Sequence, residues 1–405
     1  MNKRIHQPQK KGRHFFEYLI INIFVFAGIW LLSLFVFNVS LFNQFTQAFK
    51  DFTITDIVYS RKIIAQDSIY KKQPLLLINI EDKSREEIAF LLQRIEEGKP
   101  KVVALDIIFA DKKDSASDEL LKQTLNNYNN IITPYIASFD GVTAESKSNE
   151  YFKINSGAYV NLLGENKEYS TIRYYYPVYN KVPAFTTAII QKFDPSKANA
   201  LLKRNNTKTE IRYYGDLQNF DYKNFSEVMN PAFDADALKD KIVLLGYMGV
   251  ENKSLSKLDE DRFFTPLNQR ISGRSLPDMY GVVVIANILR MELDNDFMYA
   301  FPQWLNWLVA FLLSWILLPM FVRWYVHKAV WFHLFTMLLQ LCITMVFVFL
   351  TIWLYANANI KIESSAVLVS VLLIGDFLLF YDHLVKFFKY KLKWNFNSVF
   401  FGHEH

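Results

Sequence analysis

The sequence predicts an α/β domain with a largely parallel or mixed sheet, joined to four transmembrane α-helices, one N-terminal and three C-terminal. Two observations support this fold class. Four long apolar stretches flank a central region, and within that region short apolar runs alternate with segments of helical period. Of the 405 residues, 51% are hydrophobic while 21% are charged, which excludes a disordered chain. A single Cys also excludes an intramolecular disulfide and a Cys-based zinc site.

The apolar stretches are long enough to cross a membrane. They cover residues 18–37, 303–322, 330–355 and 364–385, and the first two contain no Asp, Glu, Lys or Arg. A helix of roughly 20 apolar residues spans the bilayer core. The first stretch is longer than the apolar part of a signal peptide, and no A-x-A-like cleavage site follows it. We therefore expect an uncleaved membrane anchor.

The positions of Lys and Arg predict the orientation. These residues gather in the tails 1–17 and 386–405, and Arg323 and Lys328 lie between the second and third spans. Such segments stay in the cytoplasm, so residues 38–301 are expected to form one extracytoplasmic domain, with both termini cytoplasmic. The formal charge of +5 then reflects topology, and no nucleic-acid partner is expected.

The domain begins with two strand–helix–strand units. The expected elements, in order, are a strand, a helix, a strand, a helix and a strand over residues 75–80, 85–97, 101–109, 117–127 and 130–137. Ser84 is a suitable N-cap for the first helix. Pro134 weakens the end of the third strand. Successive units of this kind predict parallel strands whose carboxyl ends face a ligand crevice.

The later part of the domain is less regular. Strands are expected over 172–178, 210–214 and 241–246, helices over 186–193 and 280–293, and a polar loop over 196–209. The Val and Ile content of 280–293 leaves a strand at its start possible. Gly246 and Gly249 indicate a tight turn, because the Lys-Ser/Thr pair of a phosphate-binding loop is missing.

Five segments in this region resemble the CHASE2 family of extracytoplasmic sensory domains. They are INIEDKS (78–84), KVVALDIIF (101–109), KIVLLGYMG (241–249), DRFFTP (261–266) and GVVVIAN (281–287). The resemblance covers about residues 52–300. It implies a bacterial inner-membrane protein with a periplasmic domain that acts in signal transduction.

The chain departs from the family pattern in three ways. A Trp/Pro-rich segment does not follow the first acidic pair, and Val283 and Ile285 stand where the family often has Glu and His. Family members commonly continue into a cytoplasmic output module, whereas this chain ends in the short tail 386–405. We therefore expect any output to pass through partner proteins in the membrane or periplasm.

Acidic residues, some of them at or near the ends of the predicted strands, are the candidate ligand-binding group. The candidates are Glu81, Asp82, Asp106, Asp261 and Thr265, with Asp111 as a further member. Converging carboxylates can bind a divalent cation or a cationic or hydroxylated ligand. The structural alternative is that they cap helices and satisfy loop amides, and catalysis is a third option. We assign no catalytic residue, metal ion or cofactor, and the lack of His between Phe15 and Tyr325 excludes a His-based triad or zinc centre in this domain.

Three residues in the C-terminal spans form a second candidate group. Asp376 lies within an apolar span, where an acid normally faces a partner or water. Gly375 beside it permits close helix approach, and Gln340 is a polar residue of the preceding span. These residues favour a polar contact between helices, within this chain or with another subunit, over a proton relay.

The predicted function is a non-enzymatic, membrane-anchored sensor that binds a small ligand or a protein partner. One alternative is a structural scaffold subunit of a cell-envelope complex, for which the 36 Phe and 22 Tyr residues offer contact surfaces. The other is a metal-dependent hydrolase that uses the acidic group.

Overall fold

The computed structural model describes most of the chain, in two compact units. The described residues are 11–38, 56, 58–59, 74–138, 143–154, 157–163, 171–250, 261–268, 276–327, 329–394 and 398–401. Residues 51–298 form an α/β domain, and residues 1–50 with 299–405 form a helical unit. Parts of the predicted cytoplasmic segments, namely residues 1–10, Lys328, residues 395–397 and residues 402–405, lie outside the described residues.

A five-stranded parallel sheet forms the centre of the α/β domain. Its order is β10-β1-β11-β2-β3, and the strands are Tyr222–Asn224, Leu75–Asn79, Ile242–Gly246, Val102–Leu105 and Ile131–Ile132. The three inner strands are buried along their whole length, as their continuous apolar sequences require. The prediction of a largely parallel sheet is confirmed.

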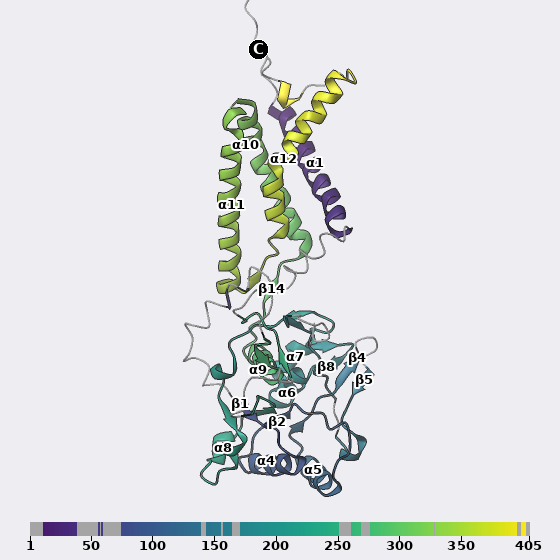
Figure 1. Ribbon diagram of the computed structural model, residues 1–405, viewed down its shortest axis with the longest axis vertical. Coiled ribbons are helices and arrows are strands. Elements are labelled where there is room, and N and C mark those ends of the chain that lie inside the picture. Colours follow the sequence, from purple (N-terminus) through teal and green to yellow (C-terminus); the bar gives the residue numbers. More distant parts are fainter. Residues whose placement is uncertain are drawn as a thin grey trace, which may run out of the picture. The chain divides into compact units, whose positions relative to one another are not determined.

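Helices cover both faces of this sheet (Figure 1). On one face lie α4 (Arg85–Glu97), α5 (Ser115–Asn127) and α8 (Phe225–Met229), and on the other α6 (Phe185–Phe193), α7 (Pro195–Leu202) and α9 (Gly281–Asp294). The first three connect β1 to β2, β2 to β3 and β10 to β11. All three crossovers run in the same direction along the sheet, so the right-handed rule places their helices on one face.

Local sequence signals account for the first helices. Ser84 and Glu87 form a capping box, in which each backbone N–H is bonded to the other residue's side chain. Ile88, Leu91 and Leu92 then face the core, as predicted. The helix expected from residue 117 begins two residues earlier, because the Asp114 side chain accepts the Ser117 N–H at 3.0 Å and acts as its N-cap.

Two sequence predictions in this domain were wrong. The polar stretch 196–209 is not a loop, since α7 occupies its first half. Pro195 is suited to a first helical position, and Asp194 caps the helix by accepting the Ser196 N–H at 3.0 Å. The strand expected over 130–137 is broken near Pro134, so only β3 stays in the sheet.

Short strand pairs complete the domain. They are β4 (Ile136–Ser138) with β5 (Thr143–Ser146), β6 (Tyr174–Tyr175) with β9 (Thr209–Glu210), β7 (Val178–Tyr179) with β8 (Val182–Pro183), and β12 (Arg262–Phe263) with β13 (Met279–Tyr280). Single 3₁₀ turns occur at Glu150–Phe152, Leu217–Asn219 and Ala235–Leu238. The strands expected over 172–178 and 210–214 are thus present only as two-residue pieces, and β13 forms the strand start just before α9.

The helical unit contains four helices that are long and apolar enough to cross a membrane. They are α1 (Lys11–Asn38), α10 (Gln303–His327), α11 (Ala329–Ala358) and α12 (Ser365–Tyr390). As predicted, one precedes the α/β domain and three follow it. Helix α12 packs against the other three, and the parallel pair β14 (Tyr299–Ala300) and β15 (Ile360–Lys361) joins the segments that precede α10 and α12. A 3₁₀ turn, Val399–Phe401, lies near the C-terminus.

A buried polar contact links α1 to α10. The Asn22 amide donates to the Phe311 carbonyl at 3.0 Å and accepts from the Ser314 hydroxyl at 2.7 Å. Both side chains are fully buried. Such contacts stabilise helix association in a bilayer, and this one was not among the predicted polar contacts.

Helix α1 packs closely against α12 at Gly28. A Cβ atom there would lie 2.1 Å from Cε1 of Phe377, so Gly28→Val forces the two helices or the Phe377 ring to move. We expect a loss of about 1–3 kcal/mol in unfolding free energy, measured by thermal unfolding of the full-length protein in detergent. Ala27→Val, on the exposed face of α1, is the matched control. Phe377→Ala in the Gly28→Val background should restore part of the loss, and two independent effects would contradict this packing.

Candidate functional site

The carboxyl ends of the central strands meet at one edge of the sheet. Glu81 and Asp82 follow β1, Asp106 follows β2, and Gly246 ends β11. Because β11 lies between β1 and β2, the strands that lead to Glu81 and to Asp106 are roughly 10 Å apart. The edge is therefore acidic on both sides of β11.

Asn79, the last residue of β1, ties this edge together. Its side-chain oxygen accepts the N–H groups of Glu81 and Met248, each at 3.0 Å. Its amide nitrogen donates to the Gly249 carbonyl at 2.9 Å and to the Asn224 side chain at 3.3 Å. One buried amide thus fixes the ends of β1, β10 and β11. Asn79 belongs to the INIEDKS segment. In the sequence, only its position near the end of a predicted strand indicated that it could join neighbouring strand ends.

The predicted acidic residues differ in exposure and in their contacts. Glu81 is largely buried, and its carboxylate lies 3.6 Å from Nζ of Lys83. Asp82 is exposed, and Asp106 is half-buried with its N–H bonded to the Leu245 carbonyl at 2.8 Å. The Asp111 side chain is exposed, while its carbonyl accepts a hydrogen bond from Arg85.

The N-terminus of α9 reaches the same edge. The Gly281 N–H donates to the carbonyl of Asp261 at 3.1 Å, and the Asp261 side chain is exposed. Gly249 has φ +86°, and a Cβ atom there would lie 2.5 Å from the Tyr280 hydroxyl oxygen. Asp261 is thus brought to the strand ends through its contact with the first residue of α9.

Thr265 is hydrogen-bonded to the half-buried Asp278 through both its backbone and its side chain. It is 2% exposed, its N–H donates to Asp278 at 2.8 Å, and its hydroxyl donates to the other oxygen of the same carboxylate. Burial raises the pKa of Asp278 above its ordinary value, although these hydrogen bonds act against the shift. Nothing in the sequence pattern indicated the role of Asp278. Within the described residues, no group of three or more His, Cys, Asp and Glu side chains is arranged to hold a metal ion.

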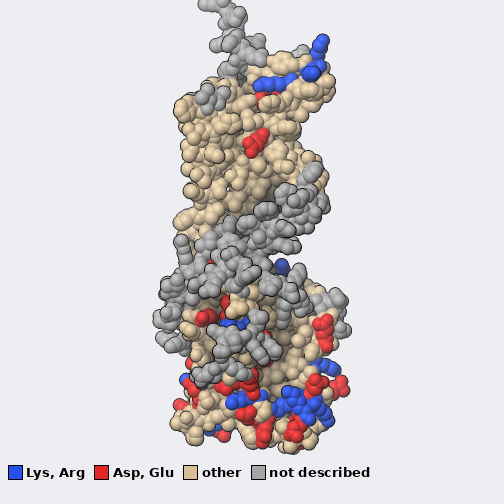
Figure 2. Space-filling view, in the orientation of Figure 1, with Lys and Arg blue, Asp and Glu red and all other residues tan. Residues whose placement is uncertain are grey.

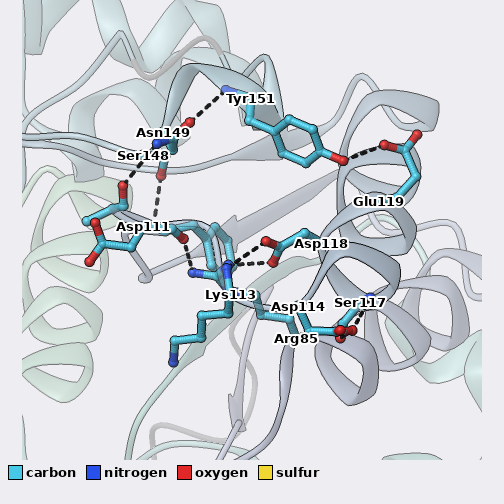
Figure 3. Close-up of polar contacts among 12 residues, drawn as sticks. Arg85, Asp111, Lys113, Asp114, Ser117, Asp118, Glu119, Ser148, Asn149 and Tyr151 are labelled. Carbon is cyan, nitrogen blue, oxygen red and sulfur yellow. Dashed lines mark hydrogen bonds and ion pairs between the residues drawn. The ribbon is translucent and has the colours of Figure 1, made fainter.

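Beside the edge, Arg85 and Asp118 form a buried ion pair (Figure 3). Arg85 also donates to the Asp111 carbonyl, and its guanidinium lies 5.7 and 5.3 Å from the ring centroids of Phe109 and Phe152. Burial disfavours the charge on Asp118, but hydrogen bonds from Arg85 and the Lys113 N–H outweigh it and lower the pKa of that carboxyl. The pair fixes the loop after β2. One feature of the sequence could have indicated a special role for Arg85. It is a basic residue in the first turn of a helix, a position that the helix dipole disfavours for a positive charge.

A second buried carboxylate lies in the last turn of α9. One oxygen of Glu292 accepts hydrogen bonds from the hydroxyls of Tyr175, Thr186 and Thr187, at 3.0 to 3.1 Å. The other oxygen is buried without a hydrogen-bond partner among the described residues. Burial raises the pKa of Glu292 to about 7, while these hydrogen bonds act against the rise. Glu292 was not a predicted site residue.

A family model of the CHASE2 domain matches residues 22–321. The chain belongs to the CHASE2 family. The match starts inside α1, includes the whole α/β domain and ends inside α10. The resemblance to CHASE2 seen in the sequence is therefore confirmed. CHASE2 is a family of sensory, extracytoplasmic domains. The four candidate spans of the chain fit a membrane protein that carries such a domain. No curated protein and no solved structure matches the chain.

The second candidate group of this CHASE2 protein lies on α11 and α12. The Gln340 amide donates to the carbonyls of Val371 and Leu372, both at 3.0 Å, and so links α11 to α12. A Cβ atom on Gly375 would lie 3.1 Å from Cγ2 of Thr336, so Gly375 also faces α11. Asp376, in contrast, is exposed on the surface of the helical unit.

Proposed function

We propose that this CHASE2 protein is a non-enzymatic membrane sensor. Its α/β domain binds a small cationic or hydroxylated ligand at the carboxyl edge of the sheet and passes the change through α9 to the membrane helices and to partner proteins. The domain lies on the periplasmic side of a bacterial inner membrane, with both termini cytoplasmic. The distribution of Lys and Arg supports this orientation.

The observation that carries the proposal is the position of α9. Its first turn lies against the strand ends, since a Cβ atom on Gly246 would be 2.8 Å from Val282. Its last turn contains Glu292, and residues 295–302 connect it directly to α10. A packed helix moves as a rigid element, so a shift at the first turn displaces the last turn and the chain that enters α10.

The chemistry of the edge supports binding rather than catalysis. The acidic side chains Glu81, Asp82, Asp106 and Asp261 border the junction that Asn79 holds. Carboxylates suit hydroxylated or cationic ligands. The α/β domain contains no His for acid–base work at neutral pH.

A ligand screen tests the proposal. Full-length protein in lipid nanodiscs is unfolded thermally in the presence of sugars, polyols, amines, amino acids and divalent cations. We expect at least one compound to raise the melting temperature, and Asp106→Asn to abolish that shift. Glu150→Gln, at an acid with an 87% exposed side chain, should retain it. If no compound stabilises the protein, the sensor proposal fails and the scaffold alternative is favoured. Turnover of a hydrolysable substrate that disappears in Asp106→Asn would instead support the hydrolase.

The coupling through α9 gives a separate prediction. Gly249→Ala places a methyl group against Tyr280 at a positive φ, which disfavours the native turn and displaces the first turn of α9. We expect faster hydrogen–deuterium exchange in residues 291–302 as well as near the substitution, measured on the full-length protein. Gly157→Ala, with no atom within 4 Å of the new Cβ, is the control. Changes confined to residues 246–282 would show that α9 does not transmit the displacement.

A further inference from the structure

Asp376 lies near the midpoint of α12, far from either end of the helix. Helix α12 has 26 residues and is therefore about 39 Å long, whereas the bilayer core is about 30 Å thick. The short Asp side chain cannot reach the lipid–water interface from this depth. In Figure 2 a group of acidic atoms lies by itself on the middle of the helical unit, apart from the charged atoms at its upper end.

Asp376 is part of a continuous exposed stripe along α12. The stripe consists of residues three or four positions apart, namely Val369, Leu372, Asp376, Phe380, His383 and Phe387. This spacing places all six on one face of the helix. The other face, with Val371, Ile374 and Leu378, is buried in the core of the helical unit.

The neighbouring helices border this stripe. Phe380 stacks on Phe24 of α1, with ring centroids 5.9 Å apart, and the Leu372 carbonyl accepts from Gln340 of α11. The stripe is thus an exposed face of α12 with α1 on one side and α11 on the other.

The other acid of α12 has protein partners inside this unit. Asp382 is fully buried, and its Oδ2 accepts hydrogen bonds from the Tyr325 hydroxyl at 2.6 Å and from Lys386 at 2.8 Å, while its Oδ1 has no hydrogen-bond partner among the described residues. Asp376 has neither a hydrogen bond nor an ion pair with any of the described residues. A carboxylate left this way in lipid is costly, which points to a partner outside the chain.

We propose that the stripe binds a transmembrane helix of a different protein, which carries a Lys or Arg opposite Asp376. The inference rests on the proposed function and names the class of its membrane partner. The apolar stripe residues supply packing, and a single charged pair fixes the register of the two helices.

The charge pattern of the chain favours a different protein over a second copy. Residues 18–37, 303–322 and 334–360 contain no Lys, Arg or His, so this chain has no cation at the depth of Asp376 in its other three spans. Two copies insert in the same orientation, and pairing them through this face would set Asp376 opposite Asp376. Like charges at that distance in lipid are unfavourable.

Site-specific photo-crosslinking in native membranes tests the inference. A benzophenone amino acid replaces Phe380 in the full-length protein, and the adduct is identified by mass spectrometry. We expect a membrane protein with Lys or Arg in the middle of a span, and an adduct at least about tenfold weaker in Asp376→Leu, because one partner of a buried charge pair is lost. Asp376→Glu should retain the adduct. The same label at Phe349, on the exposed face of α11, should not capture this protein.

A charge exchange completes the test. Asp376→Lys should lose the adduct, and replacement of the partner's basic residue by Asp should restore it. An adduct with a second copy of this chain, a partner without a mid-span cation, or an adduct that Asp376→Leu leaves unchanged would overturn the inference. The ligand screen is repeated on Asp376→Leu. Retained ligand stabilisation shows that the variant is folded, and separates failure of this inference from failure of the sensor proposal.

Discussion

Arg85→Met is expected to lower the unfolding free energy of the α/β domain by about 3 kcal/mol, the lower end of the range for a broken buried ion pair. The substitution keeps an unbranched side chain beside Phe109 and Phe152 but leaves Asp118, 2% exposed, without its cation. For a domain of this size the melting temperature should fall by roughly 6–12 °C, measured by thermal unfolding of the full-length protein.

The controls separate charge from packing. Arg85→Met combined with Asp118→Leu removes both charges, so most of the lost stability should return. Lys147→Met breaks an exposed pair with Glu150 and should change the unfolding free energy by less than about 1 kcal/mol. A single Arg85→Met variant that is as stable as the wild type would show that the pair contributes no net stability.

Glu292 is expected to make the stability of the α/β domain depend on pH. Its pKa is about 7 in the folded domain and near the ordinary value of 4.5 in the unfolded chain. The folded state therefore binds the proton more tightly. The resulting stability is fully present below pH 4.5 and is lost as the pH rises through 7. Between pH 4 and pH 8 the unfolding free energy should fall by about 3 kcal/mol from this group.

The difference between wild type and Glu292→Gln isolates this contribution. The two proteins should be similarly stable at pH 4, and Glu292→Gln should be the more stable by about 3 kcal/mol at pH 8, because it cannot ionise. Denaturant unfolding across this pH range measures the difference. Glu150→Gln should follow the wild-type curve. Parallel curves for Glu292→Gln and wild type would show that Glu292 does not titrate in this range.

Local signals in the sequence were enough to predict the elements whose formation depends mainly on their own residues. The buried runs that became β1, β2 and β11 and the N-cap Ser84 were recognisable without the fold. Helix α7 was missed because its polar surface hid the two buried residues Ala198 and Leu201. Overall polarity was therefore a poorer guide to this segment than Pro195 at its start.

The candidate site was predictable only in outline. Glu81 could be placed at a strand end because it directly follows the predicted strand 75–80. Asp106 was expected within the strand predicted over 101–109, but β2 ends at Leu105, so Asp106 lies just past it. The hydrogen bonds of Asn79 and the pairing of Arg85 with Asp118 depend on segments far apart in the chain. Thr265 was chosen from its segment, but its partner Asp278 follows only from the β12–β13 pairing. Tertiary contacts of this kind leave no periodic pattern in a single sequence.

The position of β11 has a consequence for synthesis of the protein. This strand, residues 242–246, lies between β1 and β2 and pairs with both, although it is made long after them. While the ribosome is still upstream of residue 242, β1 and β2 therefore each have an unsatisfied inner edge, and such edges promote aggregation. Non-local pairing of this kind also slows folding. Nascent chains that stop before residue 242 should depend on chaperones more than those that extend past residue 246.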